Sequence, residues 1–403
     1  MGSDKKRRDA GTGSVSLMED GRYKARFRYY SQTEGRTKNK TKLCKTEAEA
    51  KRFLKTCERE VTQFTFVSVK KETVQQFMLR WLNLIKKPDL KPTSFDRLEI
   101  TLDNHIFPTI GILQIGAVDS SSIQSLLNKL KNEGKSYSTI KKVYDALNAC
   151  FKWGVAGRLL QYNPIDAVVV PGRSKAKGKK SMGGNTNGFK YFSQDEQAKL
   201  VQAATETFPN GSLIYRFGYV IPFLLNTGLR LGELLALRWD RDVDIEARTL
   251  KIKNSIVLIK NRSEDSASKT VLLEQDSVKS GAGERSIYLN DEALAAILKI
   301  REITGSNNHV ISTKQGIPVQ PSNIERMIRS ACLRAGISPD GRNAHALRHS
   351  FATNLFAQGI DIKIISALLG HSDIAITYNI YVHVIEEQKQ DAVIMIGNKL
   401  ASN

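Results

Sequence analysis

A stretch near the C-terminus gathers side chains that suit phosphate chemistry. His345 and Arg348 stand three residues apart in a segment of helical periodicity, so they share one face of the expected helix. His371 follows a helix-ending glycine and is expected on a turn, and a third short helix carries Tyr378 and Tyr381. Arginine binds phosphate oxygens, imidazole moves protons and a phenol is a nucleophile, so the combination predicts chemistry at a phosphate.

Two more cations precede this stretch. Gly228 is expected to break a helix, which leaves Arg230 at the start of the next one, where backbone amides and the positive helix end favour a phosphate. Lys279 borders a glycine turn near an expected strand end, from which it could reach into a cleft. Taken alone, Lys279 is equally well explained as an ordinary loop lysine.

Metal and nucleotide chemistry are not indicated. His345 and His349 have the four-residue spacing of a metal-binding helix, but Ala346 stands where the metalloprotease motif requires glutamate, and no third ligand is evident. The sequence has no glycine-rich nucleotide loop, so we expect no metal, no ATP and no other cofactor. The four cysteines are widely scattered and are expected to be reduced thiols.

The charge of the chain points to a nucleic-acid partner. The 403 residues, 41% of them hydrophobic, suffice for two or three domains, and the net charge is +20. Residues 1–60 hold 17 basic and 9 acidic residues, and residues 171–190 hold six basic and no acidic ones. No strongly amphipathic basic helix stands out, which favours nucleic acid over anionic lipid. No apolar run approaches the roughly 20 residues of a membrane span, so a cytoplasmic protein with no membrane partner is expected.

The N-terminal region is expected to form a small sheet over residues 14–45. Basic side chains alternate with Tyr23, Ala25, Phe27 and Tyr29, which predicts a strand with one basic face. Such a face fits a DNA groove or a row of phosphates, although a solvated strand of an ordinary domain has the same pattern. The candidate DNA contacts in this region are Arg22, Lys24, Arg26, Arg28 and Lys40.

Residues 69–170 have helical periodicity, and helices are expected over 73–84, 121–130 and 138–153. Lysines on such helices are usually a solvated face, and the candidate DNA contacts here are Lys141 and Lys142. Residues 172–190 are rich in Gly, Ser and Lys and are expected to be a linker. The positive charge of this linker predicts that it lies along a polyanion, which it would contact through Lys175, Lys177, Lys179 and Lys180.

The remaining residues predict a mainly helical domain with a small sheet. A capping box at Ser193 begins a helix, and short strands are expected over 243–252, 256–259 and 285–289, with a polar loop around 263–268. The expected fold class is multidomain α+β, with a three-stranded sheet plus helix, an all-α domain, and a mainly α domain with a small antiparallel sheet. The expected boundaries are 1–65, 66–171, a basic linker over 172–190, and 191–403.

Taken in order, these motifs resemble those of the tyrosine recombinases, the phage integrase family. The segment TGLRLGE (227–233) resembles the first arginine box of the family, which places the catalytic arginine at Arg230 and its acidic support at Glu233. Lys279 keeps the family spacing to Ile287 and matches the lysine of the β-hairpin. Each motif is weak alone, and their ordered combination is specific.

The C-terminal boxes complete the resemblance, and they read HALR (345–348), LLGH (368–371) and IYVH (380–383). The spacing from His371 favours Tyr381 over Tyr378 as the nucleophile. Residues 69–171 are similar to the helical core-binding domain of integrases. Residues 14–60 look like the arm-binding domain of integrases from phages and conjugative transposons, the latter being the preferred subgroup.

The resemblance implies a cofactor-free reaction in which Tyr381 attacks the scissile phosphate and forms a 3′-phosphotyrosine link to DNA. It assigns charge stabilisation to Arg230 and Arg348, general acid to Lys279, base or positioning to His345, and a phosphate hydrogen bond to His371. The implied partners are double-stranded DNA with arm-type and core-type sites, three further copies in a homotetramer, and possible excisionase and DNA-bending proteins.

Two other functions fit parts of the pattern. A type IB topoisomerase-like enzyme shares the covalent chemistry without exchanging DNA partners, and a DNA-binding regulator would keep the fold without catalysis. The apolar C-terminal residues 384–396 could dock on a neighbouring subunit or on their own domain.

Overall fold

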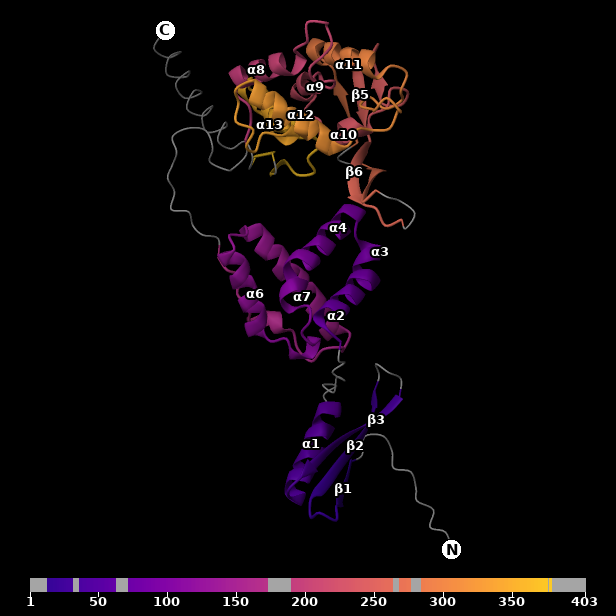
Figure 1. Cartoon of the computed structure of the whole chain (residues 1–403), viewed down its shortest axis with the longest axis vertical. Coiled ribbons are helices and arrows are strands. Elements are labelled where there is room, and N and C mark those ends of the chain that lie inside the picture. The colour runs from indigo at the N-terminus through magenta and orange to yellow at the C-terminus, as the bar shows by residue number, and fades with distance from the viewer. Residues whose placement is uncertain are drawn as a thin grey trace, which may run out of the picture. The chain divides into compact units, whose positions relative to one another are not determined.

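The computed structural model describes residues 13–31, 36–62, 72–172, 190–263, 268–276, 284–375 and 377–378. The chain divides into two compact units, residues 1–175 and 176–403, and Figure 1 labels their elements. The mixed α+β fold class expected from the sequence is confirmed. Among the described helices, none has the length and apolar character needed to cross a membrane.

A three-stranded antiparallel sheet begins the first unit, with strands β1 (Gly13–Leu17), β2 (Tyr23–Ser31) and β3 (Arg36–Cys44) in that order. Helix α1 (Glu47–Thr62) covers one face of the sheet (Figure 1). Ala25 and Phe27 of β2 are fully buried in the apolar clusters that α1 completes, whereas Lys24, Arg26 and Arg28 are exposed. The predicted alternation along this strand is therefore confirmed, because successive side chains of a strand point to opposite faces.

The other part of the first unit is helical. Its elements are α2 (Val74–Trp81), η1 (Leu82–Lys86), α3 (Lys87–Asp89), α4 (Pro92–Thr101), η2 (Leu102–Ile106), α5 (Phe107–Ile110), η3 (Ile115–Ala117), α6 (Ser120–Asn132), α7 (Tyr137–Ala156) and η4 (Pro164–Ala167). The three helices expected here are confirmed as α2, α6 and α7. The helix that runs through α4, η2 and α5 was not predicted.

Two of these segments, η1 and η2, are π-helical turns that precede a proline. Proline has no backbone N–H, and its ring collides with the carbonyl four residues earlier in a regular α-helix. Pro88 and Pro108 each lie two residues beyond a π turn, where the wider helix accommodates them. The shift in hydrogen bonding also moves the apolar face, which explains why the sequence periodicity concealed the second helix.

The second unit contains the arginine and histidine motifs. Its elements are α8 (Gln194–Thr205), α9 (Val220–Thr227), α10 (Leu231–Ala236), β4 (Val243–Asp244), β5 (Thr249–Ile252), β6 (Asn254–Lys260), β7 (Thr270–Asp276), β8 (Arg285–Tyr288), α11 (Asp291–Thr304), α12 (Pro321–Arg334), α13 (Ala344–Ala357) and α14 (Ile362–Leu369). Strands β4, β5 and β8 form one antiparallel sheet, and β6 and β7 form a separate hairpin. The strand β7 was not expected.

A glycine after α9 allows the first arginine box to fold. Gly228 has a left-handed backbone with φ of 62°, and its carbonyl accepts a hydrogen bond from Arg348 at 2.8 Å. A Cβ atom at this position would lie 2.3 Å from the ring of Phe351 in α13. The close packing of α9 on α13 therefore requires glycine here.

Replacing Gly228 by alanine is expected to lower the free energy of unfolding by about 2–5 kcal/mol. About 1–2 kcal/mol of this comes from the left-handed backbone and about 1–3 kcal/mol from overpacking against Phe351. Gly336 is a matched control, because its φ is 70° but nothing lies within 4 Å of the added Cβ. In urea unfolding, Gly336→Ala should lose only the part of the free energy of unfolding that comes from the backbone. Equal losses in the two variants would contradict the packing argument.

Candidate active site

The first arginine box forms a tight ion pair around a buried carboxylate. Arg230 stands immediately before α10, and both its backbone N–H and its Nη1 donate to Glu233, at 2.9 and 2.8 Å. Glu233 is 1% exposed, whereas the Arg230 side chain is 36% exposed. The buried Glu233 thus fixes the position of Arg230, whose side chain is exposed enough to reach a ligand.

A second arginine, which is not among the site residues predicted from the sequence, shares the same carboxylate. Arg285 at the start of β8 donates Nη2 to Glu233 at 2.8 Å and Nη1 at 3.2 Å, and its Nε donates to the Leu368 carbonyl at 2.7 Å. Despite the opposing effect of burial, Arg285 and Arg230 hold the pKa of Glu233 at about 2, well below its ordinary value. Glu233 is therefore ionised throughout the neutral range.

The third arginine connects three helices. Arg348 of α13 is 3% exposed, and it donates to the carbonyl of Gly228 at the end of α9 and to that of Leu369 at the end of α14. Arg230 donates to the next carbonyl in the chain, that of Gly370, at 3.2 Å. The predicted residues Arg230, Glu233 and Arg348 are thus brought together as the motif order implied.

Three histidines lie beside the arginines. The rings of His345 and His349, one helical turn apart on α13, meet edge to face with centroids 5.4 Å apart. His371 follows the end of α14, and its Nδ1 lies 2.8 Å from the hydroxyl of the buried Thr377. Since Thr377 engages Nδ1, the Nε2 atom is the nitrogen of His371 that remains to meet a ligand.

Burial and the neighbouring guanidinium groups lower the pKa of all three histidines. The pKa of His349 and that of His371 fall to about 4, and the pKa of His345 is also below its ordinary value. The rings are therefore neutral near pH 7. Because the histidines are neutral, the charge of the described cluster comes from its three arginines and from Glu233. The net charge is therefore +2, which suits a phosphate anion.

Several predicted residues lie outside the described part of the chain. These are the lysine and tyrosine assigned to catalysis and the four linker lysines, namely Lys279, Tyr381, Lys175, Lys177, Lys179 and Lys180. Tyr378, the alternative nucleophile, is described and is 42% exposed. Within the described residues, no group of His, Cys, Asp and Glu has an arrangement that could hold a metal ion.

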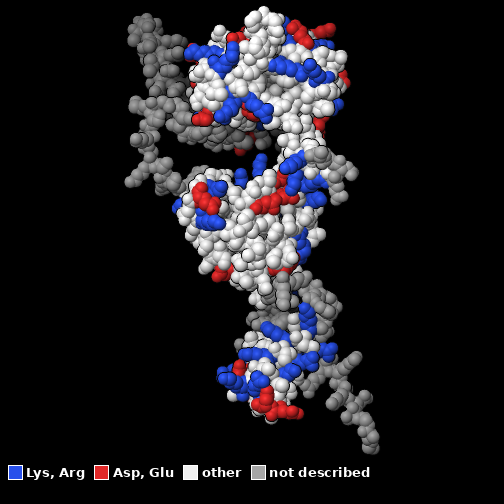
Figure 2. All heavy atoms as spheres, in the orientation of Figure 1, with Lys and Arg blue, Asp and Glu red and all other residues white. Residues whose placement is uncertain are grey.

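The candidate DNA contacts of the first unit do not share one face. Lysines and arginines gather on the visible surface of the small sheet part (Figure 2). Arg22, Lys24, Arg26 and Arg28 are all exposed. Lys40 pairs with Phe27 in the ladder, which turns it to the face covered by α1, and its Nζ lies 5.9 Å from the Phe53 ring centroid.

The two helix lysines also differ in their surroundings. Lys141 forms an ion pair with Asp145 one turn along α7 and lies over the ring of Tyr144, 4.9 Å from its centroid. Lys142 is exposed. Lys142 is therefore the better placed of the two to meet a phosphate, because Lys141 would first have to leave its partner.

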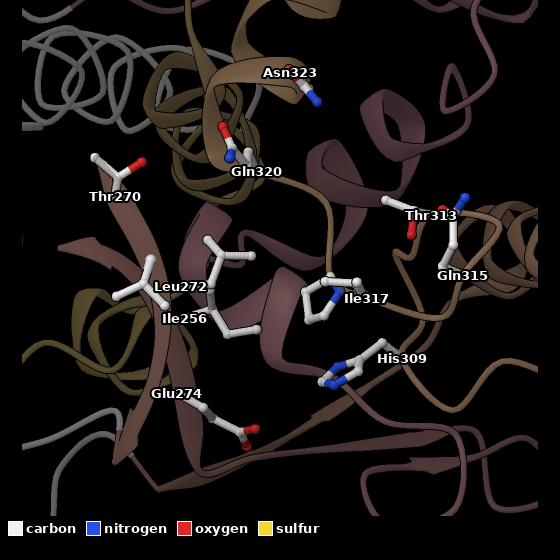
Figure 3. Close-up of a pocket in the computed structure, with 12 residues that line it drawn as sticks. Ile256, Thr270, Leu272, Glu274, His309, Thr313, Gln315, Ile317, Gln320 and Asn323 are labelled. Carbon is white, nitrogen blue, oxygen red and sulfur yellow. The ribbon is translucent and has the colours of Figure 1, made fainter. Parts of the chain in front are cut away.

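A hollow of about 760 Å³ lies elsewhere in the second unit, between β7 and residues 309–323. Figure 3 shows Glu274 and His309 near one end and Gln320 and Asn323 near the other, with Ile256, Leu272 and Ile317 between them. Among the described residues that line this hollow there is no lysine or arginine, and the charged one, Glu274, is acidic. It is therefore unsuited to a phosphate and is separate from the arginine cluster.

The described cluster is a set of fixed arginines and neutral imidazoles, which are groups suited to a phosphate anion. The phage integrase family model matches residues 190–388, and the model of the phage integrase central domain matches residues 74–169. The chain therefore belongs to the phage integrase family, the tyrosine recombinases, and is an enzyme of the site-specific recombinase class. The family resemblance stated from the motifs is confirmed.

Related sequences and solved structures are consistent with this family membership. A XerC-like tyrosine recombinase of Caldanaerobacter subterraneus subsp. tengcongensis is 29% identical over 81% of this chain and 83% of its own. The XerD tyrosine recombinase of Rickettsia prowazekii is 30% identical over 47% of this chain and 57% of its own. The integrase of transposon Tn1549, solved with a circular intermediate DNA, has a TM-score of 0.60 at 21% identity, covering 80% of this chain and 99% of that one. A lambda integrase dimer bound to a core site has a TM-score of 0.54 at 17% identity, covering 93% and 96%. The structural likenesses show the shared fold.

The buried histidine His349 should make stability depend on pH. Its pKa is about 4 in the folded chain and near its ordinary 6.5 in the unfolded chain, so between these values only the unfolded chain takes up the proton. Acid therefore favours unfolding. Between pH 7 and 4.5 the wild type is expected to lose on the order of 2 kcal/mol more than His349→Gln, at about 1.4 kcal/mol per pH unit. Urea unfolding at each pH gives the free energy of unfolding of both proteins. If it depended on pH in the same way in wild type and in His349→Gln, a neutral buried His349 would be contradicted.

Proposed function

We propose that the chain is a DNA integrase that cuts and rejoins DNA at specific sites through a covalent 3′-phosphotyrosine intermediate. The observation that carries the proposal is the convergence of Arg230, Arg348 and His371 at the C-terminal end of α14. A fixed pair of guanidinium groups beside a neutral imidazole matches the non-bridging oxygens of a scissile phosphate. The family membership supports the same reaction.

The proposed reaction exchanges one ester for another. The Tyr381 oxygen forms a bond to phosphorus while the bond to the 5′ oxygen breaks, and Lys279 gives the departing oxygen its proton. Neutral His345 accepts the phenolic proton or positions the phenol. Arg230 and Arg348 stabilise the added negative charge of the pentavalent phosphate, and His371 donates to it through Nε2. The covalent link conserves the bond energy, so religation requires no cofactor.

Double-stranded DNA is the proposed partner, and the element served is proposed to be a mobile one of the conjugative-transposon kind. The Tn1549 and lambda integrase structures, both with DNA bound, support this assignment. Residues 1–65 would bind arm-type sites, residues 66–171 core-type sites, and residues 191–403 would cut DNA, with the basic linker 172–190 along the backbone. A homotetramer would carry out exchange, as a lambda integrase tetramer on a Holliday junction suggests.

The nucleophile can be tested with a nicked duplex that traps the cleaved strand. Wild-type protein should form a covalent complex that survives denaturant, whereas Tyr381→Phe should bind DNA within about threefold and form none. Tyr378→Phe is the matched control and should keep the complex. Covalent complex with Tyr381→Phe would overturn the nucleophile assignment. Recombinant product from two separate duplexes distinguishes the integrase from a topoisomerase-like enzyme.

The basic face of the N-terminal sheet can be tested by salt dependence. Arg26→Glu should weaken binding of the full chain to a random-sequence duplex by about 5- to 10-fold and lower the salt slope by about 1–2, because a phosphate contact is lost. Lys40→Glu makes the same kind of charge change on the face that α1 covers, so its effect should be clearly smaller. Equal losses would contradict a one-sided DNA surface.

A further inference from the structure

We propose that Arg285 is a positioning residue for DNA cleavage, a role that rests on the function proposed above. It neutralises Glu233 and fixes the C-terminal end of α14, so that the charge of Arg230 acts on the scissile phosphate. Arg285 itself lies beneath the site, with its side chain only 7% exposed. Its Nε, Nη1 and Nη2 atoms all donate to Leu368 or Glu233, so it acts through these neighbours rather than on DNA.

The contacts of Arg285 place it at a junction of three elements. Two of its nitrogens, Nη1 and Nη2, donate to the two carboxylate oxygens of Glu233 in α10, and Nε donates to the Leu368 carbonyl of α14. This fork geometry gives direction as well as charge, which lysine cannot reproduce with a single nitrogen.

Charge balance explains why a second arginine is required. If Glu233 faced Arg230 alone, the two would form a neutral pair, and a buried carboxylate would hold the guanidinium strongly because burial strengthens the attraction. With Arg285 present, the group of three carries one net positive charge. That charge is exposed only through Arg230, whose side chain is 36% exposed against 7% for Arg285.

The contact with α14 extends the role to His371. Gly370 ends α14 with a left-handed backbone, and a Cβ atom there would lie 2.9 Å from Nη1 of Arg285. Arg285 therefore packs directly beneath the turn that carries His371. Loss of the guanidinium would leave a gap under this turn and one unpaired carbonyl, and the phosphate-facing groups would lose their alignment.

The test compares Arg285→Gln with wild type on two nicked duplexes, one with a normal scissile phosphate and one with a methylphosphonate. The methyl group removes the negative charge that Arg230 stabilises. At saturating protein, Arg285→Gln should slow covalent complex formation about 10- to 100-fold on the phosphate and less than about threefold on the methylphosphonate, with DNA binding within threefold. Arg285→Lys should recover part of the lost rate on the phosphate.

The outcomes separate the possibilities. A uniform slowing on both duplexes would mean a merely structural role and would overturn the proposal, as would an unchanged rate on the phosphate. Arg342→Gln is the matched control, because Arg342 is also partly buried and pairs with Glu196 at 2.8 Å away from this cluster. It should cut both duplexes at the wild-type rate. If wild-type protein forms no covalent complex, the proposed function itself fails. If Arg285→Gln does not fold, the same comparison of cleavage rates on the two duplexes is made with Arg285→Lys.

Discussion

Three consecutive backbone carbonyls at the end of α14 organise the candidate active site. Those of Leu368, Leu369 and Gly370 accept hydrogen bonds from Arg285, Arg348 and Arg230, which come from β8, α13 and the start of α10. The last carbonyls of a helix lack partners within the helix and carry its partial negative charge. One helix end therefore gathers three cations from distant parts of the chain that would otherwise repel one another.

The carboxylate of Glu233 completes this arrangement. Its pKa of about 2 means that it carries a full negative charge between two arginines, although it is almost completely buried. A buried ion is tolerated only with partners of opposite charge, and removing one partner leaves the other uncompensated. The net positive charge of the site thus depends on the buried Glu233 and Arg285 as well as on the partly exposed Arg230.

Local patterns in the sequence located Arg230, Arg348 and His371, but they did not locate Arg285, which shares the carboxylate of Glu233. Each of these three residues lies in a short motif that can be found in the sequence, although the fold sets their geometry relative to one another. Arg285 was missed because its partners Glu233 and Leu368 lie 52 and 83 residues away in the sequence, so only the tertiary fold reveals them. The helix through η2 was missed for a local reason, since a π turn breaks the 3.6-residue period. The strand β7 was missed because it follows an expected polar loop and ends in the polar residues 274–276, which obscured its short apolar run.

Under the proposed function, the histidines would couple proton transfer to the presence of DNA. The arginines that would bind the phosphate also lower the pKa of His345 and of His371, so the rings are neutral while no anion is present. A bound phosphate offsets the positive charge, and an anion beside an imidazole favours the protonated form. The same arginines therefore keep the rings neutral, and so able to accept a proton. When a phosphate binds the arginines, their effect on the rings weakens and the pKa of each ring rises. Under the proposed function, proton acceptance by His345 would thus be easier once a phosphodiester lies in the site.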